Sequence, residues 1–214
     1  MWMKIRLRGM NRVKKLLFAT KNPAKIKNYK DKLKKENIKI ITIKDLNLEK
    51  DLEIIENGKD AIENAKIKAQ SYYRKTKMTT IGMDVNLYIK GLSKEQQPKN
   101  YIRRVNGKEL TDEEMVEYYT GIIHKLGGEA NIHYLHGTAL CKEGKIETIV
   151  EKTDLIFLEK RSEIMTKGYP LDSITWIPKY NKFLSELTSE ERNDRKRENS
   201  RKEKNMIQFI LDNI

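Results

Sequence analysis

The sequence predicts an α/β protein with an elongated mixed β-sheet flanked by helices, divided into two lobes around a central cleft. Short apolar strands alternate with amphipathic helices over residues 14–89, which is typical of parallel βαβ units. Two long segments of alternating apolar and polar residues, 130–142 and 145–158, flank a Glu143-Gly144 turn and predict an antiparallel hairpin that carries the second lobe. The 214 residues suffice for a single two-lobed domain, which we expect over 14–214.

The first predicted strand, 14–20, leads into a predicted helix over 22–36. Asn22 is a preferred N-cap residue, and Pro23 has a backbone angle suited to the first helical position. The unpaired N–H groups of such a first turn attract anions, and Lys25 adds a positive charge. The turn therefore predicts an anion site, for phosphate in particular. A capped strand-to-helix turn is equally common as a purely structural feature.

The next elements continue the βαβ pattern. Residues 38–43 form a short predicted strand, and a loop rich in acidic residues, 45–58, leads into a predicted helix over 60–74. A second buried strand, 78–83, is expected to end at the following aspartate, with 85–89 as a short extended continuation.

Charged side chains lie where these segments end. Because the carboxyl ends of parallel strands lie side by side, we expect Lys25, Glu56, Lys68 and Asp84 to converge. Two carboxylates beside a polyphosphate can hold Mg²⁺, and one carboxylate can deprotonate or orient an attacking water. The two lysines would neutralise charge on the leaving group. A single aspartate at a strand end is more commonly a turn former.

The C-terminal half is predicted from caps and alternation. Residues 91–110 are irregular, and a capping box opens a helix over 112–126 before the hairpin begins. Residues 161–180 form a loop with a short strand around 173–177. A second capping box opens a helix that runs to the C-terminus, and its part over 192–204 has no hydrophobic residue. This part is either an exposed helix or a mobile insertion.

The net charge of +13 is concentrated near the N-terminus. Residues 1–37 hold 13 Lys or Arg and two acidic residues, whereas the rest of the chain is nearly balanced. We expect 1–13 to be a basic N-terminal extension. Such charge could attract nucleic acid, but no interleaved aromatic residues accompany it. A lysine-rich helix face beside a polyphosphate site is therefore favoured, and a nucleic-acid partner is not expected.

The cysteine and histidine content and the hydropathy of the chain restrict the class of protein further. Cys141 is the only cysteine, so no internal disulfide or cysteine-based metal site can form. His133 and His136 fall in an alternating strand, where a structural role is favoured. No apolar run approaches the roughly 20 residues that span a membrane, and no signal peptide is evident. We therefore expect a cytoplasmic protein without a membrane partner.

Six blocks of sequence match, in order, the motifs of one enzyme family. The family motifs are T-G-N-x-x-K-x-x-E, E-x-G-x-T-F-x-E-N-A-x-x-K-A, A-D-D-S-G-L, P-G-x-Y-S-A-R, G-Y-D-P-I-F-x-P and A-E-L-x-x-E-E-K-N. They correspond in this chain to residues 20–28, 56–69, 82–87, 98–104, 168–178 and 185–193. On these residues the chain resembles the inosine triphosphate pyrophosphatase family, whose members hydrolyse deaminated purine nucleoside triphosphates such as ITP, dITP and XTP to nucleoside monophosphate and pyrophosphate.

The resemblance implies a role for each matching residue. Asp84 would be the general base or a metal ligand, Lys68 would share the catalytic site, and Glu56 would be a second ligand of Mg²⁺. The family also implies a homodimer. Tyr169 would stack on the base and Asp172 would help to read its edge. The substrate-binding residues implied in all are Thr20, Lys21, Asn22, Lys25, Val85, Tyr169, Asp172 and Arg192.

Some motif positions depart from the family. Met83 and Val85 flank Asp84 where the family has Asp and Ser, and Asn28 replaces the Glu that closes the first motif. An S-H-R triplet that helps recognise the purine is missing at its usual spacing after Asn193. Loss of such hydrogen-bonding partners is expected to relax the selection of the base, with less effect on hydrolysis itself. Two alternatives therefore stay open: a catalytically weakened nucleotide- or nucleic-acid-binding protein on the same fold, and a pyrophosphatase with altered base specificity.

Overall fold

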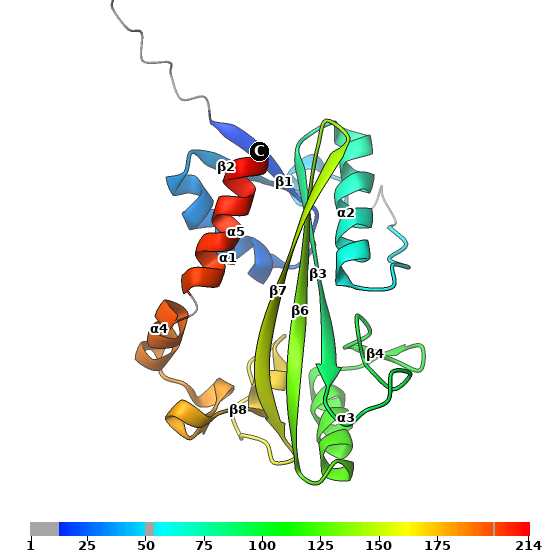
Figure 1. Ribbon diagram of the computed structural model, residues 1–214, viewed down its shortest axis with the longest axis vertical. Helices are drawn as coiled ribbons and strands as arrows, with labels where there is room; N and C mark the ends of the chain where they lie inside the picture. The colour runs from blue at the N-terminus through cyan, green and yellow to red at the C-terminus, as the bar shows by residue number, and fades with distance from the viewer. Residues whose placement is uncertain (1–12, 50–53, 199) are drawn as a thin grey trace, which may run out of the picture.

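The computed structural model describes residues 13–49, 54–198 and 200–214. Their main feature is a seven-stranded mixed sheet with the strand order β2-β1-β3-β6-β7-β8-β9 (Figure 1). Helices cover both faces of this sheet, so the predicted α/β class with an elongated mixed sheet is confirmed. Most of the predicted extension 1–13 lies outside the described residues. No helix of the described residues is long and apolar enough to cross a membrane.

The N-terminal part is the predicted strand–helix–strand unit. Strand β1 (Lys14–Phe18) lies parallel to β2 (Ile38–Thr42), and helix α1 (Pro23–Lys35) connects them. Helix α1 begins at Pro23, and the side chain of Asn22 accepts a hydrogen bond from the backbone N–H of Lys25. The predicted cap is therefore present. A short 3₁₀ helix, η1 (Lys44–Leu46), follows β2.

Three long strands join the two halves of the molecule. Strand β3 (Thr80–Ile89) pairs with β1 in parallel and with β6 (Glu129–Lys142) in antiparallel orientation, and β6 forms the predicted hairpin with β7 (Lys145–Leu158). The prediction that the strand ends at Asp84 is wrong. Hydrogen bonding to β6 continues along the whole of β3, so Asp84 lies in the middle of a strand.

Helix α2 (Ala61–Thr76) packs unusually close to the sheet because the strands present glycines to it. A Cβ atom on Gly82 would lie 2.2 Å from the carbonyl oxygen of Ala65, and one on Gly137 would lie 2.6 Å from the backbone of Ala61. The N-cap of α2 is Asp60, whose side chain accepts the backbone N–H of Glu63. This close packing brings polar residues of α2 within hydrogen-bonding distance of β3.

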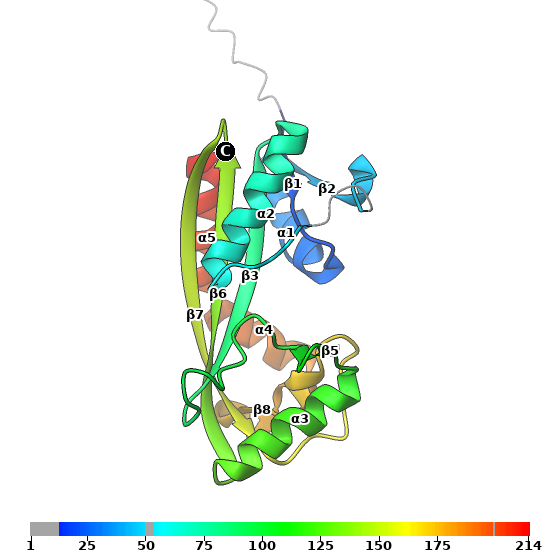
Figure 2. The ribbon, with the colours of Figure 1, turned by 90° about the vertical axis from the view of Figure 1, so that its right-hand side faces the viewer.

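The opposite face of the sheet carries two separate hydrophobic cores. Helices α1 and α5 (Ser200–Asn213) cover its upper part, and α3 (Asp112–Lys125) covers its lower part. Figure 2 shows α1 and α3 separated along the long strands, on the same side of them. On this face, Val85, Tyr134 and His136 are only partly buried, whereas their neighbours in both cores are buried. They form an accessible strip between the two lobes.

The remaining elements complete the lower lobe. Strands β8 (Thr175–Ile177) and β9 (Lys182–Phe183) extend the sheet, and β4 (Arg104–Val105) pairs with β5 (Lys108–Glu109) inside the segment expected to be irregular. Short 3₁₀ helices lie around β8 and β9, namely η2 (Pro170–Ser173), η3 (Pro178–Tyr180) and η4 (Leu184–Glu186).

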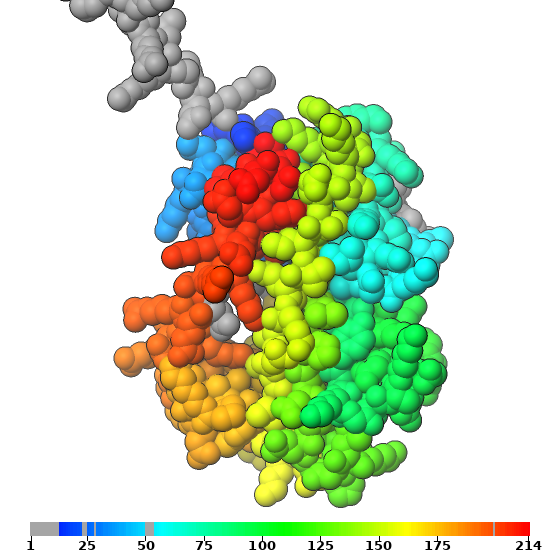
Figure 3. Space-filling view, in the orientation of Figure 1, coloured from blue at the N-terminus to red at the C-terminus, as the bar shows by residue number. Residues whose placement is uncertain are grey.

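The helix expected to run to the C-terminus is described in two parts, α4 (Ser189–Glu198) and α5, on either side of residue 199, which lies outside the described residues. Helix α4 has no buried residue among those described, and Lys179 holds it through ion pairs to Asp194 and Glu198. Helix α5 is amphipathic and buries Met206 and Ile210 in the upper core. The two segments therefore pack on different partners. The surface is hollowed where α4, α5 and β7 meet (Figure 3).

Candidate active site

The candidate site lies at a free edge of β3. Strand β1 pairs with β3 only at Thr80 and Ile81, and the N–H of Ala19 donates to the carbonyl oxygen of Ile81 before β1 turns away. Carbonyl groups two residues apart project from the same edge of a strand, so that of Met83 projects where β1 has left the sheet. This oxygen accepts hydrogen bonds from Lys25 Nζ at 3.4 Å and from Lys68 Nζ at 3.5 Å.

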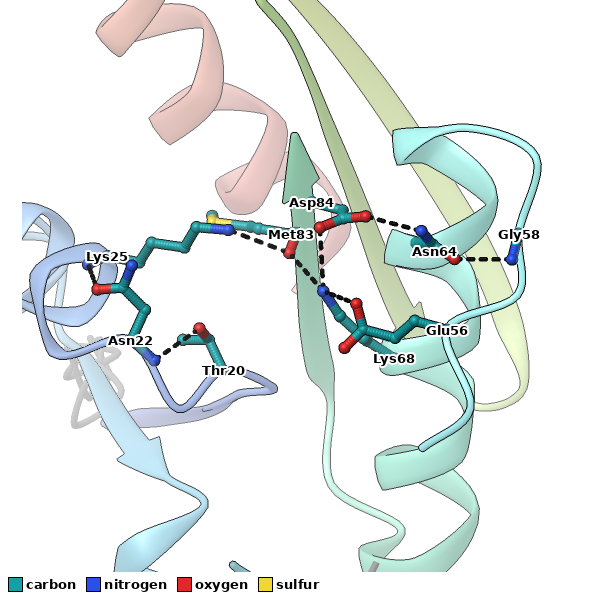
Figure 4. Close-up of polar contacts among 9 residues, drawn as sticks. All are labelled: Thr20, Asn22, Lys25, Glu56, Gly58, Asn64, Lys68, Met83 and Asp84. Atoms are coloured by element: carbon teal, nitrogen blue, oxygen red, sulfur yellow. Dashed lines mark hydrogen bonds and ion pairs between the residues drawn. The ribbon is translucent and has the colours of Figure 1, made fainter. Parts of the chain in front are cut away.

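The turn after β1 positions Lys25. The hydroxyl oxygen of Thr20 accepts the backbone N–H of Asn22, and Asn22 then caps α1 (Figure 4). Lys21 is exposed on the same turn. Burial, reinforced by the charge of Lys68, lowers the pKa of Lys25. A bound anion would relieve the repulsion between the two ammonium groups, which is the property expected of a phosphate site.

Lys68 holds the two predicted carboxylates. Its Nζ atom lies 2.8 Å from Oε2 of Glu56 and 3.1 Å from Oδ1 of Asp84. The side chains of Lys68 and Asp84 are each only 12% exposed, whereas that of Glu56 is 43% exposed. The structure thus brings together Lys25, Glu56, Lys68 and Asp84, as the sequence predicted. Figure 4 shows the two lysines approaching the strand from opposite sides.

Asn64 is the site residue that sequence reasoning missed. Its side chain donates to Oδ2 of Asp84 at 2.9 Å and accepts the backbone N–H of Gly58 at 2.8 Å, and the residue is fully buried. It therefore fixes the Asp84 carboxylate and the loop that carries Glu56. The available signal was its spacing, because Asn64 and Lys68 are four residues apart and share one face of α2.

The carboxylates of Glu56 and Asp84 fit a hard divalent cation. Both reach the same ammonium group, so they lie on one side of the strand edge. Within 13–49, 54–198 and 200–214, no group of three or more His, Cys, Asp or Glu residues could hold a metal ion. Magnesium is commonly bound through one or two carboxylates, substrate phosphates and waters, and this donor set matches that pattern.

The other predicted substrate residues lie elsewhere. Val85 belongs to the strip between the lobes, on the face opposite Asp84. Tyr169, which is 45% exposed, and Asp172 belong to the lower lobe, where burial raises the pKa of Asp172 to about 6 against the opposing charges of Arg192 and Arg195. Within the described part of the chain, no hydrogen bond or ion pair links the side chains of Tyr169 and Asp172 to the lysine–carboxylate cluster.

Arg192 has a structural task in this conformation. Its guanidinium donates to the backbone carbonyl oxygens of Leu184, Ser185 and Leu187 and so braces the turn before α4. Its predicted contact with the triphosphate stays a prediction, as do the predicted roles of Tyr169 and Asp172.

Together, the fold and the site define an α/β protein with a mixed seven-stranded sheet and a cluster of two lysines and two carboxylates at the free edge of β3. The family model of the Ham1 family matches residues 16–204, and the chain belongs to this family. The resemblance inferred from the sequence motifs is thereby confirmed.

Curated relatives match most of this chain. A dITP/XTP pyrophosphatase of Halalkalibacterium halodurans is 26% identical over 181 residues, which cover 85% of this chain and 91% of the relative. A dITP/XTP pyrophosphatase of Caldanaerobacter subterraneus subsp. tengcongensis is 29% identical over 184 residues, covering 84% and 88%.

Solved structures share the fold. A HAM1 protein from Coxiella burnetii matches with a TM-score of 0.70 at 22% identity, over 84% of this chain and 90% of that one. The Staphylococcus aureus Ham1 protein matches with a TM-score of 0.67 at 21% identity, over 83% and 88%.

Proposed function

We propose that this chain is a nucleoside triphosphate pyrophosphatase that hydrolyses deaminated purine nucleotides such as ITP, dITP and XTP to nucleoside monophosphate and pyrophosphate. Membership in the Ham1 family and the dITP/XTP pyrophosphatases among its relatives support this activity. The observation that carries the proposal is the convergence of Lys25 and Lys68 on the free edge of β3, beside the carboxylate of Asp84.

The residues of the site suit an attack of water on the α-phosphorus. Lys25 and Lys68 hold the triphosphate and neutralise the charge that develops on the departing pyrophosphate. Asp84, fixed by Asn64, is the group that accepts a proton from the attacking water or orients that water. The ammonium group of Lys68 lies 3.1 Å from Oδ1 of Asp84 and so helps to position this carboxylate.

A divalent metal, specifically Mg²⁺, is part of the proposal. The pyrophosphatase family suggests a divalent-metal requirement, and Glu56 and Asp84 would hold the ion. When bound, such an ion neutralises phosphate charge and lowers the pKa of a coordinated water. Glu56 is the more exposed of the two carboxylates and lies on the loop before α2.

Met83 stands where the family has an aspartate. Its side chain packs in the upper core with Leu16 and Phe18, on the face of β3 opposite Asp84 and on the side from which Lys25 approaches (Figure 4). The proposed proton acceptor is therefore Asp84, and Met83 supplies no second carboxylate beside Lys25. The proposed contacts of the base with Tyr169 and Asp172, without the S-H-R triplet at its usual spacing, favour relaxed base selection.

The test is release of pyrophosphate from a panel of triphosphates with Mg²⁺: ITP, dITP, XTP, dUTP and the four standard nucleotides. Asp84→Asn is expected to lower kcat by about 10²- to 10⁴-fold, the usual contribution of a general base. Asp154→Asn, on an exposed part of β7, is the matched control and should behave as the unmodified protein. Binding of nucleotide without turnover of any substrate would instead favour the weakened binding protein.

Three further parts of the proposal concern context. A homodimer is proposed from the family resemblance, and sedimentation equilibrium would measure it directly. A cytoplasmic location is proposed, and cell fractionation would check it. We also propose that residues 14–214 form a single folding unit, which would unfold in one transition by calorimetry.

A further inference from the structure

The strip between the two lobes contains a row of three side chains, two of them polar, that the proposed chemistry does not use. Val85 of β3, His136 of β6 and Glu151 of β7 are in register, and their side chains share the face that carries both cores. Thr138 and Met83 on the upper side of this row are buried, as is Leu87 on the lower side. The row is therefore an accessible polar gap between two apolar cores.

Two polar groups in this row have no hydrogen-bond partner among the described residues. Oε1 of Glu151 is buried without a hydrogen-bond partner among the residues that the structure describes. The imidazole of His136 makes no hydrogen bond within 13–49, 54–198 and 200–214. Buried polar groups are normally hydrogen-bonded, so Oε1 of Glu151 needs a donor from solvent or from a bound molecule.

The surroundings of His136 are positively charged and aromatic. The charges of Lys25 on α1 and Lys202 on α5 act on it, and the ring of Tyr134 lies 6.1 Å from its own. Lys202 is held on β7 by the carbonyl oxygen of Lys152 and the hydroxyl of Thr153. Burial and these two lysines lower the pKa of His136 to about 4, so the neutral ring offers one N–H donor and one acceptor.

The row also lies between the two halves of the predicted substrate site. Lys25 and Lys68, which are proposed to hold the phosphates, meet on its upper side at the carbonyl oxygen of Met83. On its lower side is Tyr134, whose hydroxyl is influenced by the charge of Asp172. Two residues along a strand span roughly 7 Å, so a nucleotide that reaches from Lys25 toward Asp172 must cross His136.

We propose that His136 is a nucleotide-binding residue that contacts the substrate at the junction of its α-phosphate and sugar. This inference rests on the proposed function for the class of ligand. It predicts that His136 serves the nucleoside monophosphate half of the substrate, whereas Lys25 and Lys68 serve the pyrophosphate half.

The test is calorimetric binding of IMP and of pyrophosphate, each with Mg²⁺, to the full chain. His136→Leu is expected to weaken IMP about tenfold, the loss of one or two hydrogen bonds, and to leave pyrophosphate unchanged. His136→Asn should restore part of the IMP affinity. His133→Leu is the matched control, because His133 lies on the other face of β6, stacked on Tyr88, and should change neither affinity.

Unchanged IMP binding in His136→Leu, equal weakening of both ligands, or no IMP binding by the unmodified protein would each overturn the inference. The proposed function is tested separately, by measuring hydrolysis of the triphosphates. If IMP binding depends on His136 while no triphosphate is hydrolysed, the inference stands and the proposed activity fails. If hydrolysis proceeds and IMP binding is indifferent to His136, the reverse holds.

Discussion

The ammonium groups of Lys25 and Lys68 meet at one backbone oxygen, although the two residues come from helices on opposite faces of the sheet. Their Nζ atoms lie 3.4 and 3.5 Å from the carbonyl oxygen of Met83. The meeting is possible only because β1 leaves β3 after Ile81, which frees the strand edge for access from both faces. Burial and the charge of Lys68 lower the pKa of Lys25, and the charges of Asp84 and Glu56 oppose this shift.

Removing one of these charges should impair substrate use without unfolding the protein. We expect Lys25→Met to lower kcat/KM by about 10²-fold, because a partly buried cation facing a phosphate contributes several kcal/mol. Lys27→Met, exposed on the same helix, is the control. Steady-state kinetics with the preferred triphosphate would measure both, and equal values for the two variants would contradict the role of Lys25.

Asn64 should matter for both stability and turnover. Asn64→Ala leaves the N–H of Gly58 and one oxygen of Asp84 without their partner, which costs about 1–3 kcal/mol of unfolding free energy. It also releases the carboxylate, so kcat should fall. Urea unfolding and kinetics of the same preparation would measure the two effects. The exposed Asn131→Ala is the control, and an Asn64→Ala enzyme with unchanged kcat would remove Asn64 from the site.

The close approach of α2 to the sheet can be tested with two glycines. In Gly137→Ala the new Cβ would lie 2.6 Å from the backbone of Ala61, so we expect destabilisation of about 1–3 kcal/mol and a lower kcat as α2 shifts. Gly121 lies within α3 with no atom within 4 Å of an added Cβ. Gly121→Ala should therefore stabilise the protein by roughly 0.5–1 kcal/mol. Equal effects of the two substitutions on the melting temperature would argue against the tight packing.

Removal of metal should stop turnover but leave the fold intact. Lys68 pairs with both Glu56 and Asp84, and Asn64 also holds Asp84, so the site does not depend on a metal ion for its structure. We expect EDTA to abolish hydrolysis and to leave the melting temperature within about a degree, because only metals that bind the free native state stabilise it. A fall of several degrees on chelation would indicate a structural metal instead.

The raised pKa of Asp172 predicts a dependence of stability on pH. Burial raises this pKa from 3.8 to about 6. Between these values the folded state holds a proton that the unfolded state has lost, so the free energy of unfolding falls as pH rises from about 4 to about 6. Asp172→Asn lacks this contribution. Urea unfolding across this range should show that the free energy of unfolding of Asp172→Asn rises relative to that of the unmodified protein as pH rises. If the two free energies change with pH in parallel, the pKa of Asp172 is not raised by folding.

Local signals in the sequence predicted most of the elements and the charged residues of the site. Apolar periodicity located α2 and the β6–β7 hairpin, and the capped turn at Asn22 predicted the anion site, because each of these signals is local. The spacing of Glu56, Lys68 and Asp84 within motifs then indicated that they belong to one site.

The positions at which these residues meet depend on contacts between elements that are distant in the sequence. Asp84 lies within β3 rather than at its end, because pairing with β6 continues on one side after β1 has left on the other. Asn64 joined the site and His136 reached the strip between the lobes through contacts between distant elements. Periodicity reports which residues share a face of their own element, whereas strand pairing over long separations decides which edge is left open and which faces meet.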